Sequence, residues 1–377
     1  GHGYLRPPQS IMSYASLACI AIQANQNEMH GGQSVPNFDY SMAQGVDKTY
    51  SKEYFKALIQ FFQVSKAMPY DQVKAMVDNV KENLGGHVDM DKAQAYGQKV
   101  AGYLPRHQRE NGFEEITQEE ALQAAQYAAQ TAWRETDKAT YQAMEALIHN
   151  LNTMHSRAGA QTPFSSINYG MDTSPEGRMV MKNVMLATEA GLGDGETPIF
   201  PVQIFKVKEG VNYNEGDPNY DLFKLSCKVS AKRLFPNFSF IDAPFNLQYY
   251  KPGHPETEIA YMGCRTRVIG NVYDPSREIC NGRGNLSFTT INLPRLAIKA
   301  RGDLDAFFEG LDRMLDLCVD AGMKAQSFFQ NWEEMMESYL LGGQFWQHED
   351  QNNPNSMTAE RWKLYEQLWQ GRKPFQS

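Results

Sequence analysis

The sequence is poor in cysteine and lacks the cysteine spacings that hold a metal. Its 377 residues include five cysteines, scattered and without a CxxC pair. An odd number of isolated thiols predicts neither a disulfide framework nor a zinc site. The eight histidines form no HExxH or HxH pair, so no metal ligand set is predicted. Such thiol usage suits a reducing compartment, and we expect a cytoplasmic protein.

Basic residues and long apolar runs are also scarce. The chain has 36 Lys and Arg against 44 Asp and Glu, a formal net charge of −8, so we expect no nucleic-acid partner. No apolar stretch approaches the length of a membrane span, and no membrane association is expected. The opening residues, GHGYLRPPQS, lack an initiator Met and the order of a signal peptide. We therefore expect a piece cut from a longer protein.

What the sequence does contain is a helical first half. Residues 11–29 have apolar residues at helical spacing and stop at HGG, and QSVPNF after them predicts a short strand. From 41 to 155 the pattern is helical. Thr117 and Glu120 have the spacing of a capping box and begin a helix that runs toward Met154. A helix of that length often packs against another subunit.

Short strand-like runs bounded by Gly, Pro and Asn follow. They are PFSSINYG, FPVQIFKV, DLFKLSCKV, TEIAYMGCRTRVIG and GNLSFTTINLPRLAI, and helices return at about 303–340. Strands separated by helices predict an α/β fold with a largely parallel sheet, open or closed into a barrel. The glycine-rich GRGNLSFTT and GLGDGETP fit neither a phosphate loop nor a dinucleotide fingerprint.

Four of the cysteines have ordinary interpretations. Cys19 and Cys318 lie on apolar helix faces and are predicted to pack there. Cys227 alternates with apolar residues, which predicts the inward face of a strand. Cys280 is predicted to be an incidental loop thiol.

Cys264, in YMGCRTRVIG, is the exception. Gly263 permits close backbone approach, and Arg265 and Arg267 would stabilise an anion. No Cys–His partnership can be identified, which argues against hydrolase-type catalysis. The residues alone leave a reactive and an incidental thiol both open.

Four long blocks resemble the anaerobic, class III ribonucleoside-triphosphate reductases. They are ACIAIQANQNEMHGGQSVPNFDY (18–40), ALIHNLNTMHSRAGAQTPFSSINYG (146–170), MGCRTRV (262–268) and GRGNLSFTTINLPRLAI (282–298). The resemblance implies a ten-stranded α/β barrel of the glycyl-radical enzyme and ribonucleotide reductase type, with a central finger loop. We expect residues 1–340 to form this catalytic core, with 41–155 as a mainly helical dimer and effector region and 255–290 as the finger loop and its flanking strands. Residues 341–377 receive no role.

The resemblance also implies the chemistry. Cys264 corresponds to the thiol that carries a thiyl radical and takes the 3′ hydrogen of a ribonucleotide. Thr266 and Asn285 correspond to polar side chains of that small site, where formate acts as reductant. The expected substrate-binding residues, in the loops HGGQS and SRAGAQ and the run PFSSINYG, are His30, Gly31, Gly32, Gln33, Ser34, Arg157, Gln161, Ser165 and Asn168.

The implied substrates are ribonucleoside triphosphates, and the implied effectors are ATP and deoxynucleoside triphosphates. A homodimer and a radical-SAM activating enzyme are implied as partners. The family's glycyl-radical loop RVCGY, its zinc site with paired CxxC motifs, its ATP-binding cone and its second active-site cysteine do not occur in this sequence. We expect them in the missing parts of a longer protein.

Two alternatives stay open beside this prediction. One is another glycyl-radical enzyme, although the acyl-transferring type typically has two adjacent cysteines where Met-Gly-Cys-Arg offers one. The other is a nucleotide-binding regulatory fragment that keeps the barrel without its chemistry.

Overall fold

The chain forms two compact units. The structure, a computed structural model, describes residues 6–28, 31–110, 116–157, 159–263, 266–270, 276, 278–283 and 289–336. The larger unit comprises residues 8–27 and 32–281, and the smaller comprises 1–7, 28–31 and 282–377. Each is described by itself below.

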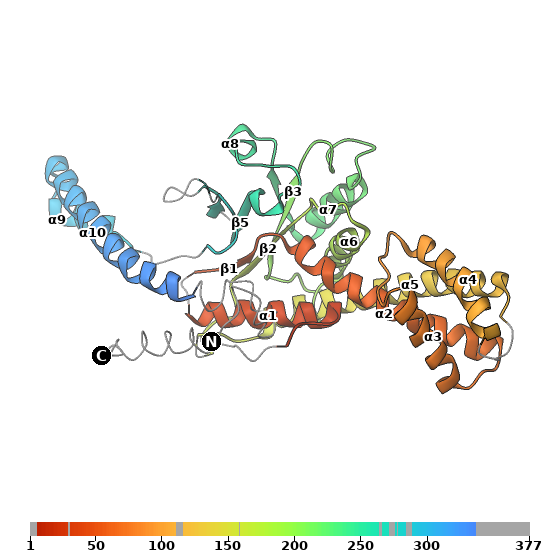
Figure 1. Cartoon of the computed structure of the whole chain (residues 1–377). Coiled ribbons are helices and arrows are strands. Elements are labelled where there is room, and N and C mark those ends of the chain that lie inside the picture. Colours follow the sequence, from red (N-terminus) through yellow and green to blue (C-terminus); the bar gives the residue numbers. More distant parts are fainter. Residues whose placement is uncertain are drawn as a thin grey trace, which may run out of the picture. The chain divides into compact units, whose positions relative to one another are not determined.

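Helices dominate the first half of the larger unit (Figure 1). Its helices are α1 (Ile11–Glu28), α2 (Phe38–Ser65), α3 (Tyr70–Leu84), α4 (Ala93–Glu110), α5 (Gln118–Thr153), α6 (Pro175–Ala190), α7 (Tyr220–Arg233) and α8 (Pro244–Leu247), with a 3₁₀ turn at Pro255–Thr257. The predicted capping box of α5 is confirmed: Thr117 Oγ1 accepts from Glu120 N at 3.2 Å, and Glu120 Oε2 accepts from Thr117 N at 2.8 Å. The predicted helices at 11–29 and 117–154 are therefore present.

The sheet of the larger unit is parallel. Its strands lie in the order β1 (Gln33–Val35), β2 (Ser165–Tyr169), β3 (Val202–Val207) and β4 (Asn237–Phe240). Helices connect successive strands, which confirms the predicted α/β class with crossovers. A separate antiparallel hairpin pairs β5 (Ala260–Met262) with β6 (Thr266–Val268). These described strands do not make a ten-stranded barrel, so the barrel stays a prediction.

The two faces of the sheet differ in character. Ile167 and Tyr169 on β2 and Phe205 on β3 belong to the main apolar core, which they share with the helices. Because side chains alternate along a strand, Ser166 and Asn168 point to the opposite face. That face meets β5, which lies across β2 from α6 and α7 in Figure 1. The hairpin side thus carries Ser166 and Asn168, and the helix side carries the aromatic residues of the core.

One predicted strand is wrong, and a second is wrong over its last residues. DLFKLSCKV lies within helix α7, where Leu222, Ser226 and Val229 are buried at helical spacing and Cys227 is exposed. Residues 293–298 of the last predicted strand belong to helix α9 (Leu293–Ala300). The prediction also missed α6 and β4. In each case the packing against neighbouring elements, which one sequence does not display, decides the conformation.

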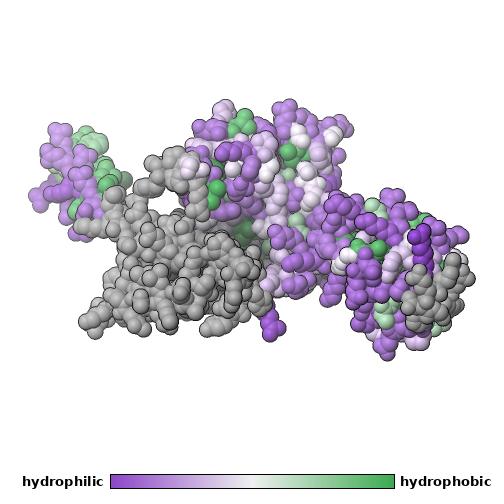
Figure 2. Space-filling view, in the orientation of Figure 1, coloured by the Kyte–Doolittle hydropathy of each residue, from purple (hydrophilic) through white to green (hydrophobic). Residues whose placement is uncertain are grey.

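The smaller unit contains α9 and the long helix α10 (Leu304–Met336), which pack against each other. Cys318 on α10 is half-buried, and the neighbouring Leu315 is exposed. The predicted packing of Cys318 on an apolar helix face is therefore not complete among the described residues. None of the helices in the described ranges combines the length and apolarity needed to span a membrane. The surface over α3 and α4 is mainly hydrophilic, with small apolar spots (Figure 2).

Candidate functional site

The backbone just before Cys264 lies against the hairpin side of the sheet. Asn168 on β2 contacts Tyr261 on β5 through both ends of its side-chain amide: Oδ1 accepts from Tyr261 N at 2.8 Å, and Nδ2 donates to Tyr261 O at 2.9 Å. Ser34 on β1 donates to the same carbonyl oxygen at 2.9 Å and accepts from Asn168 Nδ2 at 3.1 Å. Three segments far apart in sequence therefore meet at the backbone of one residue, Tyr261.

Gly263 is fixed by the next side chain on the same face. Its N–H donates to Ser166 Oγ at 3.0 Å, and its φ of +64° is a conformation that favours glycine. A Cβ at this position would lie 3.0 Å from the Phe164 ring. The glycine before Cys264 thus serves both a backbone conformation and a close approach.

A buried ion pair lies on the same side of the sheet. Lys206 on β3 donates to Glu258 Oε2 at 2.9 Å, and their side chains are 0% and 3% exposed. Tyr40 donates to Glu258 Oε1 at 3.0 Å, and Lys206 also donates to Asn37 Oδ1 at 2.9 Å. Burial raises the pKa of Glu258, and the attraction of Lys206 opposes that rise. The pair attaches the segment that leads into β5 to the sheet.

Cys280 joins this network. Its thiol is buried and accepts a hydrogen bond from Asn37 Nδ2 at 3.8 Å, and burial raises its pKa. The raised pKa keeps the thiol protonated and unreactive as a nucleophile. It packs inside the unit rather than in an exposed loop.

The turn after β2 is organised by one carboxylate. Asp39 Oδ2 accepts from the backbone N–H groups of Gly170, Met171 and Asp172 at 2.9, 3.0 and 3.1 Å. Asp172 is itself buried, and burial raises its pKa to about 6, helped by the nearby Asp39. The start of α2 is thereby attached to the carboxyl end of β2.

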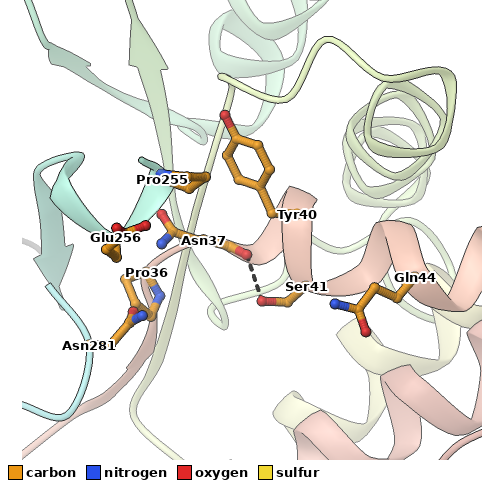
Figure 3. Close-up of a pocket in the computed structure, with 8 residues that line it drawn as sticks. All are labelled: Pro36, Asn37, Tyr40, Ser41, Gln44, Pro255, Glu256 and Asn281. Carbon is orange, nitrogen blue, oxygen red and sulfur yellow. Dashed lines mark hydrogen bonds between the residues drawn. The ribbon is translucent and has the colours of Figure 1, made fainter. Parts of the chain in front are cut away.

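A small polar pocket opens beside this network (Figure 3). Its cavity is about 230 Å³, and it is lined by Pro36, Asn37, Tyr40, Ser41, Gln44, Pro255, Glu256 and Asn281. This volume is below the ~300 Å³ at which ligand pockets usually begin, so a nucleoside triphosphate would not fit inside it. None of the predicted site residues lines this pocket.

The structure places the predicted residues in two groups. Ser34 and Asn168 lie together at the hairpin. Arg157 and Gln161 lie in another loop, where Arg157 donates to Gln26 O at 3.0 Å and to Gln161 Oε1 at 2.9 Å. These contacts hold that loop against the end of α1.

The other predicted residues are more dispersed. Alternation along β2 puts Ser165 on the face opposite Asn168. Gln33 begins β1, and its N–H donates to Phe164 O at 2.8 Å. A Cβ at Gly32 would lie 2.6 Å from the Phe164 ring, so this glycine serves a protein contact. Gly31, with φ of +69°, belongs to the smaller unit.

Three predictions fall outside the described residues: Cys264, Asn285 and His30. Thr266 is exposed and lies opposite Met262 across the hairpin. The anion-stabilising role expected of Arg267 stays a prediction, and the contacts seen for this side chain include Asn246 and Phe245. Its Nε donates to Asn246 Oδ1 at 2.9 Å, and its guanidinium lies 5.4 Å from the centre of the Phe245 ring.

Sequence reasoning missed Ser166, Asp39 and the Lys206–Glu258 pair. Lys206 offered a signal, because a lysine inside an otherwise apolar strand is rarely buried without a partner. Its partner lies 52 residues away, and no spacing rule connects the two.

One surface cluster has side chains of metal-ligand type. His87 Nε2 lies 3.0 Å from Asp47 Oδ2 and 3.2 Å from Asp89 Oδ1. Lys92 also contacts Asp89, at 2.7 Å. The cluster therefore has the charge partners of an exposed ion-pair network, and it shares no residue with the hairpin site.

Comparisons with known proteins identify the family of this chain. A family model described as anaerobic ribonucleoside-triphosphate reductase matches residues 1–364. Relatives of that name are 35% identical in Salmonella typhimurium and 34% in Escherichia coli, each over 189 residues, which is 50% of this chain and 25% of the relative. The relative from Enterobacteria phage T4 is 36% identical over 197 residues, 51% of this chain and 32% of its own length. The aligned stretch is thus a quarter to a third of these relatives, and the chain belongs to the anaerobic ribonucleoside-triphosphate reductase family.

Proposed function

We propose that this chain is the substrate-reducing core of an enzyme that converts ribonucleoside triphosphates to deoxyribonucleoside triphosphates under anaerobic conditions. Family membership supports the reaction, and the observation that carries the site is the fixed backbone at Tyr261–Gly263. Cys264 follows directly in the sequence. A thiol that carries a radical needs a fixed position more than it needs a base.

The proposed reaction begins at Cys264 as a thiyl radical. The thiyl takes the 3′ hydrogen of the ribose, and the 2′ hydroxyl leaves as water after gaining a proton. Formate then gives its hydrogen atom to C2′, passes its remaining electron to the sugar together with a proton, and leaves as carbon dioxide. Cys264 finally returns its hydrogen to C3′ and becomes a thiyl radical again. A glycyl radical, in a segment outside this sequence, supplies the oxidising equivalent. Thr266 and Asn285 are proposed to hold formate and the hydroxyls, because neutral side chains hydrogen-bond both without titrating.

The sheet supports the proposal that its four strands belong to the ten-stranded barrel of the family. One face packs on helices, whereas the other carries Ser34, Ser166, Asn168 and Lys206 toward the hairpin. An α/β barrel requires this division, since its outer face meets helices and its inner face meets the finger loop. In the same proposal Gly31, Gly32, Gln33, Arg157, Gln161 and His30 approach the substrate, whereas Ser165, on the helix-facing side of β2, does not.

Effector binding is proposed at a basic groove on α2 and α3. The groove has a cavity of about 920 Å³ and includes the aromatic side chains of Phe55 and Tyr70. Its cationic side chains are Lys48, Lys52, Lys56, Lys74 and Lys81. Lysines and aromatic rings suit the triphosphate and base of a deoxynucleoside triphosphate. α2 packs on α5, whose exposed Tyr127 and Trp133 support the proposed homodimer.

The test measures ribonucleotide reduction by the full-length parent protein under anaerobic conditions. The parent is first activated by its radical-SAM partner in a reducing buffer. The Cys264→Ser variant should keep the glycyl-radical EPR signal and lose turnover by more than about 1,000-fold, because a serine hydroxyl cannot replace the thiol that exchanges hydrogen with C3′. Cys227→Ser is the matched control, because Cys227 is exposed on α7 and should not matter. Turnover that survives in Cys264→Ser would overturn the assignment. Full turnover without formate would overturn only the assignment of formate as the reductant.

A further inference from the structure

We propose that Asn168 is a positioning residue that sets the place of the backbone carrying the radical thiol, rather than a substrate contact. The proposal rests on the proposed function, in which Cys264 carries the radical. Asn168 is fully buried, and its amide is engaged by Tyr261 and Ser34. Both hydrogens of its Nδ2 are donated, its Oδ1 already accepts one hydrogen bond, and the buried side chain presents no exposed atom to a nucleotide.

The amide replaces a neighbouring strand. In a sheet, one strand's backbone N–H and C=O pair with the backbone of the next strand. Here a single side chain pairs with both groups of Tyr261, accepting at 2.8 Å and donating at 2.9 Å. One residue of β2 thus holds both the N–H and the C=O of Tyr261.

Asparagine suits this role better than the chemically similar residues aspartate and glutamine. Aspartate offers no donor when ionised, and glutamine adds a methylene that the 2.8 and 2.9 Å contacts leave no room for. Alanine would leave the Tyr261 N–H without this partner, which costs more than the bond itself contributes, and would leave the Tyr261 carbonyl with Ser34 as its side-chain donor.

Ser166 extends the same attachment by two residues. Its hydroxyl accepts from Gly263 N, the backbone group immediately before Cys264. Asn168 and Ser166 are neighbours on one face of a strand whose other face lies in the apolar core. The rigidity of the core is thereby passed to residues 261–263.

Hydrogen transfer depends strongly on the distance between the sulfur and C3′. A misplacement of about 1 Å reduces the rate of such a step about 100-fold. Loss of the Asn168 contacts should therefore lower kcat and leave the KM of the ribonucleotide nearly unchanged, because its binding groups lie elsewhere.

The first experiment measures hydrogen exchange on this chain and needs no activity. Asn168→Ala should speed exchange of the Tyr261 and Gly263 amides at least about tenfold by local opening. Asn212→Ala is the matched control. Asn212 is also fully buried and donates to Gly170 O and Lys206 O at 2.9 Å, so it should cost similar stability without loosening Tyr261.

The second experiment uses the activated full-length parent. Asn168→Ala should lower kcat about 100-fold with KM within about threefold and the glycyl-radical EPR signal retained. Ser166→Ala, a smaller change, should lower kcat about tenfold and speed Gly263 exchange. It carries the test if Asn168→Ala does not fold.

Three outcomes would overturn the proposal: unchanged exchange at Tyr261, a kcat equal to that of Asn212→Ala, or a raised KM with normal kcat, which marks a substrate contact. Failure of the proposed function is distinguishable. Turnover in Cys264→Ser would reject the radical thiol whatever the exchange shows, and the exchange alone would still decide whether Asn168 holds the backbone.

Discussion

Asp172 is a buried carboxyl group with other carboxyls nearby. Its pKa is raised from 3.8 to about 6, chiefly by burial and also by Asp39 and Glu176, and hydrogen bonds from Ser174 limit the rise. A group whose pKa is higher in the folded state stabilises the fold when protonated. That stability is fully present below pH 3.8 and is lost as the pH rises through 6.

We expect the Asp172→Asn variant to keep this stability as the pH rises. The variant keeps an oxygen to accept from Ser174 N, at 2.9 Å in the native protein, and cannot ionise. A shift of about two pKa units corresponds to about 3 kcal/mol, so the variant should gain up to about that much over the native chain between pH 4 and pH 7. Urea unfolding followed by circular dichroism at several pH values measures the difference.

The control is Asp78→Asn on α3. The hydrogen bond from Lys74 lowers the pKa of Asp78, so its charged form stabilises the fold above its ordinary pKa. Its pH trend should have the opposite sign. A pH-independent difference between Asp172→Asn and the native chain would contradict the argument.

At the scale of elements, α1 and α2 approach closely at a glycine. A Cβ on Gly45 would lie 2.9 Å from the Tyr14 ring and 3.0 Å from Ile11 Cα. Ile11 N also donates to Thr49 Oγ1 at 2.9 Å, one helical turn along α2. The contact involves backbone, so the two helices would have to separate to admit a side chain.

Gly45→Ala should therefore destabilise the chain by about 1–3 kcal/mol through overpacking. Gly102→Ala on α4 is the matched change, because a Cβ there has no neighbouring atom within 4 Å among the described residues. Alanine at that exposed helical position should stabilise by up to about 1 kcal/mol. Thermal unfolding of both variants gives the sign of each change in stability. Equal shifts of the melting temperature in the two variants would rule out the close crossing of α1 and α2.

At the scale of the whole molecule, the distribution of charge matters more than its sum. The chain has a net charge of −8, yet five lysines line one groove of about 920 Å³. Lys56 and Lys74 pair with Glu53 and Asp78. Within the described part of the chain, Lys52 forms no ion pair. An acidic protein with a concentrated basic groove attracts an anion to that place and repels it elsewhere.

We expect deoxynucleoside triphosphates to raise the melting temperature of this chain by mass action at the groove. Lys52→Ala should weaken that binding about tenfold, and added salt should weaken it in the native chain. Calorimetric titration with dATP and dTTP measures both effects. Lys228→Ala, on α7, serves as the control, and equal affinities for the two variants would place the binding elsewhere.

Local signals predicted the elements whose partners are near in sequence. The capping box of Thr117 and Glu120 marked the start of α5, and short apolar runs marked β2 and β3. The same logic failed at α7, where Phe223, Leu225, Cys227 and Val229 alternate as in a strand. The buried set that decided the matter has helical spacing, and only packing against α6 selects it.

Some residues of the candidate site could be predicted from the sequence, but the contacts between them could not. Asn168 was identified through the family blocks, but its partner Tyr261 lies 93 residues away. Its neighbour Ser166 was missed because a serine in a strand has no distinguishing pattern. Ser165, grouped with Asn168 from the sequence, lies on the opposite face because side chains alternate along β2.

The sequence by itself therefore determined the family, the helical first half and three of the four parallel strands of the described sheet, and it predicts the thiol on which the proposed chemistry depends. Those features rest on ordered blocks and local periodicity. Only the tertiary structure decided which side chains hold Tyr261–Gly263, which acid pairs with Lys206 and which face of the sheet meets the hairpin. These contacts depend on the register of distant segments, and hydrogen bonds between them form only where the fold brings both partners within about 3 Å.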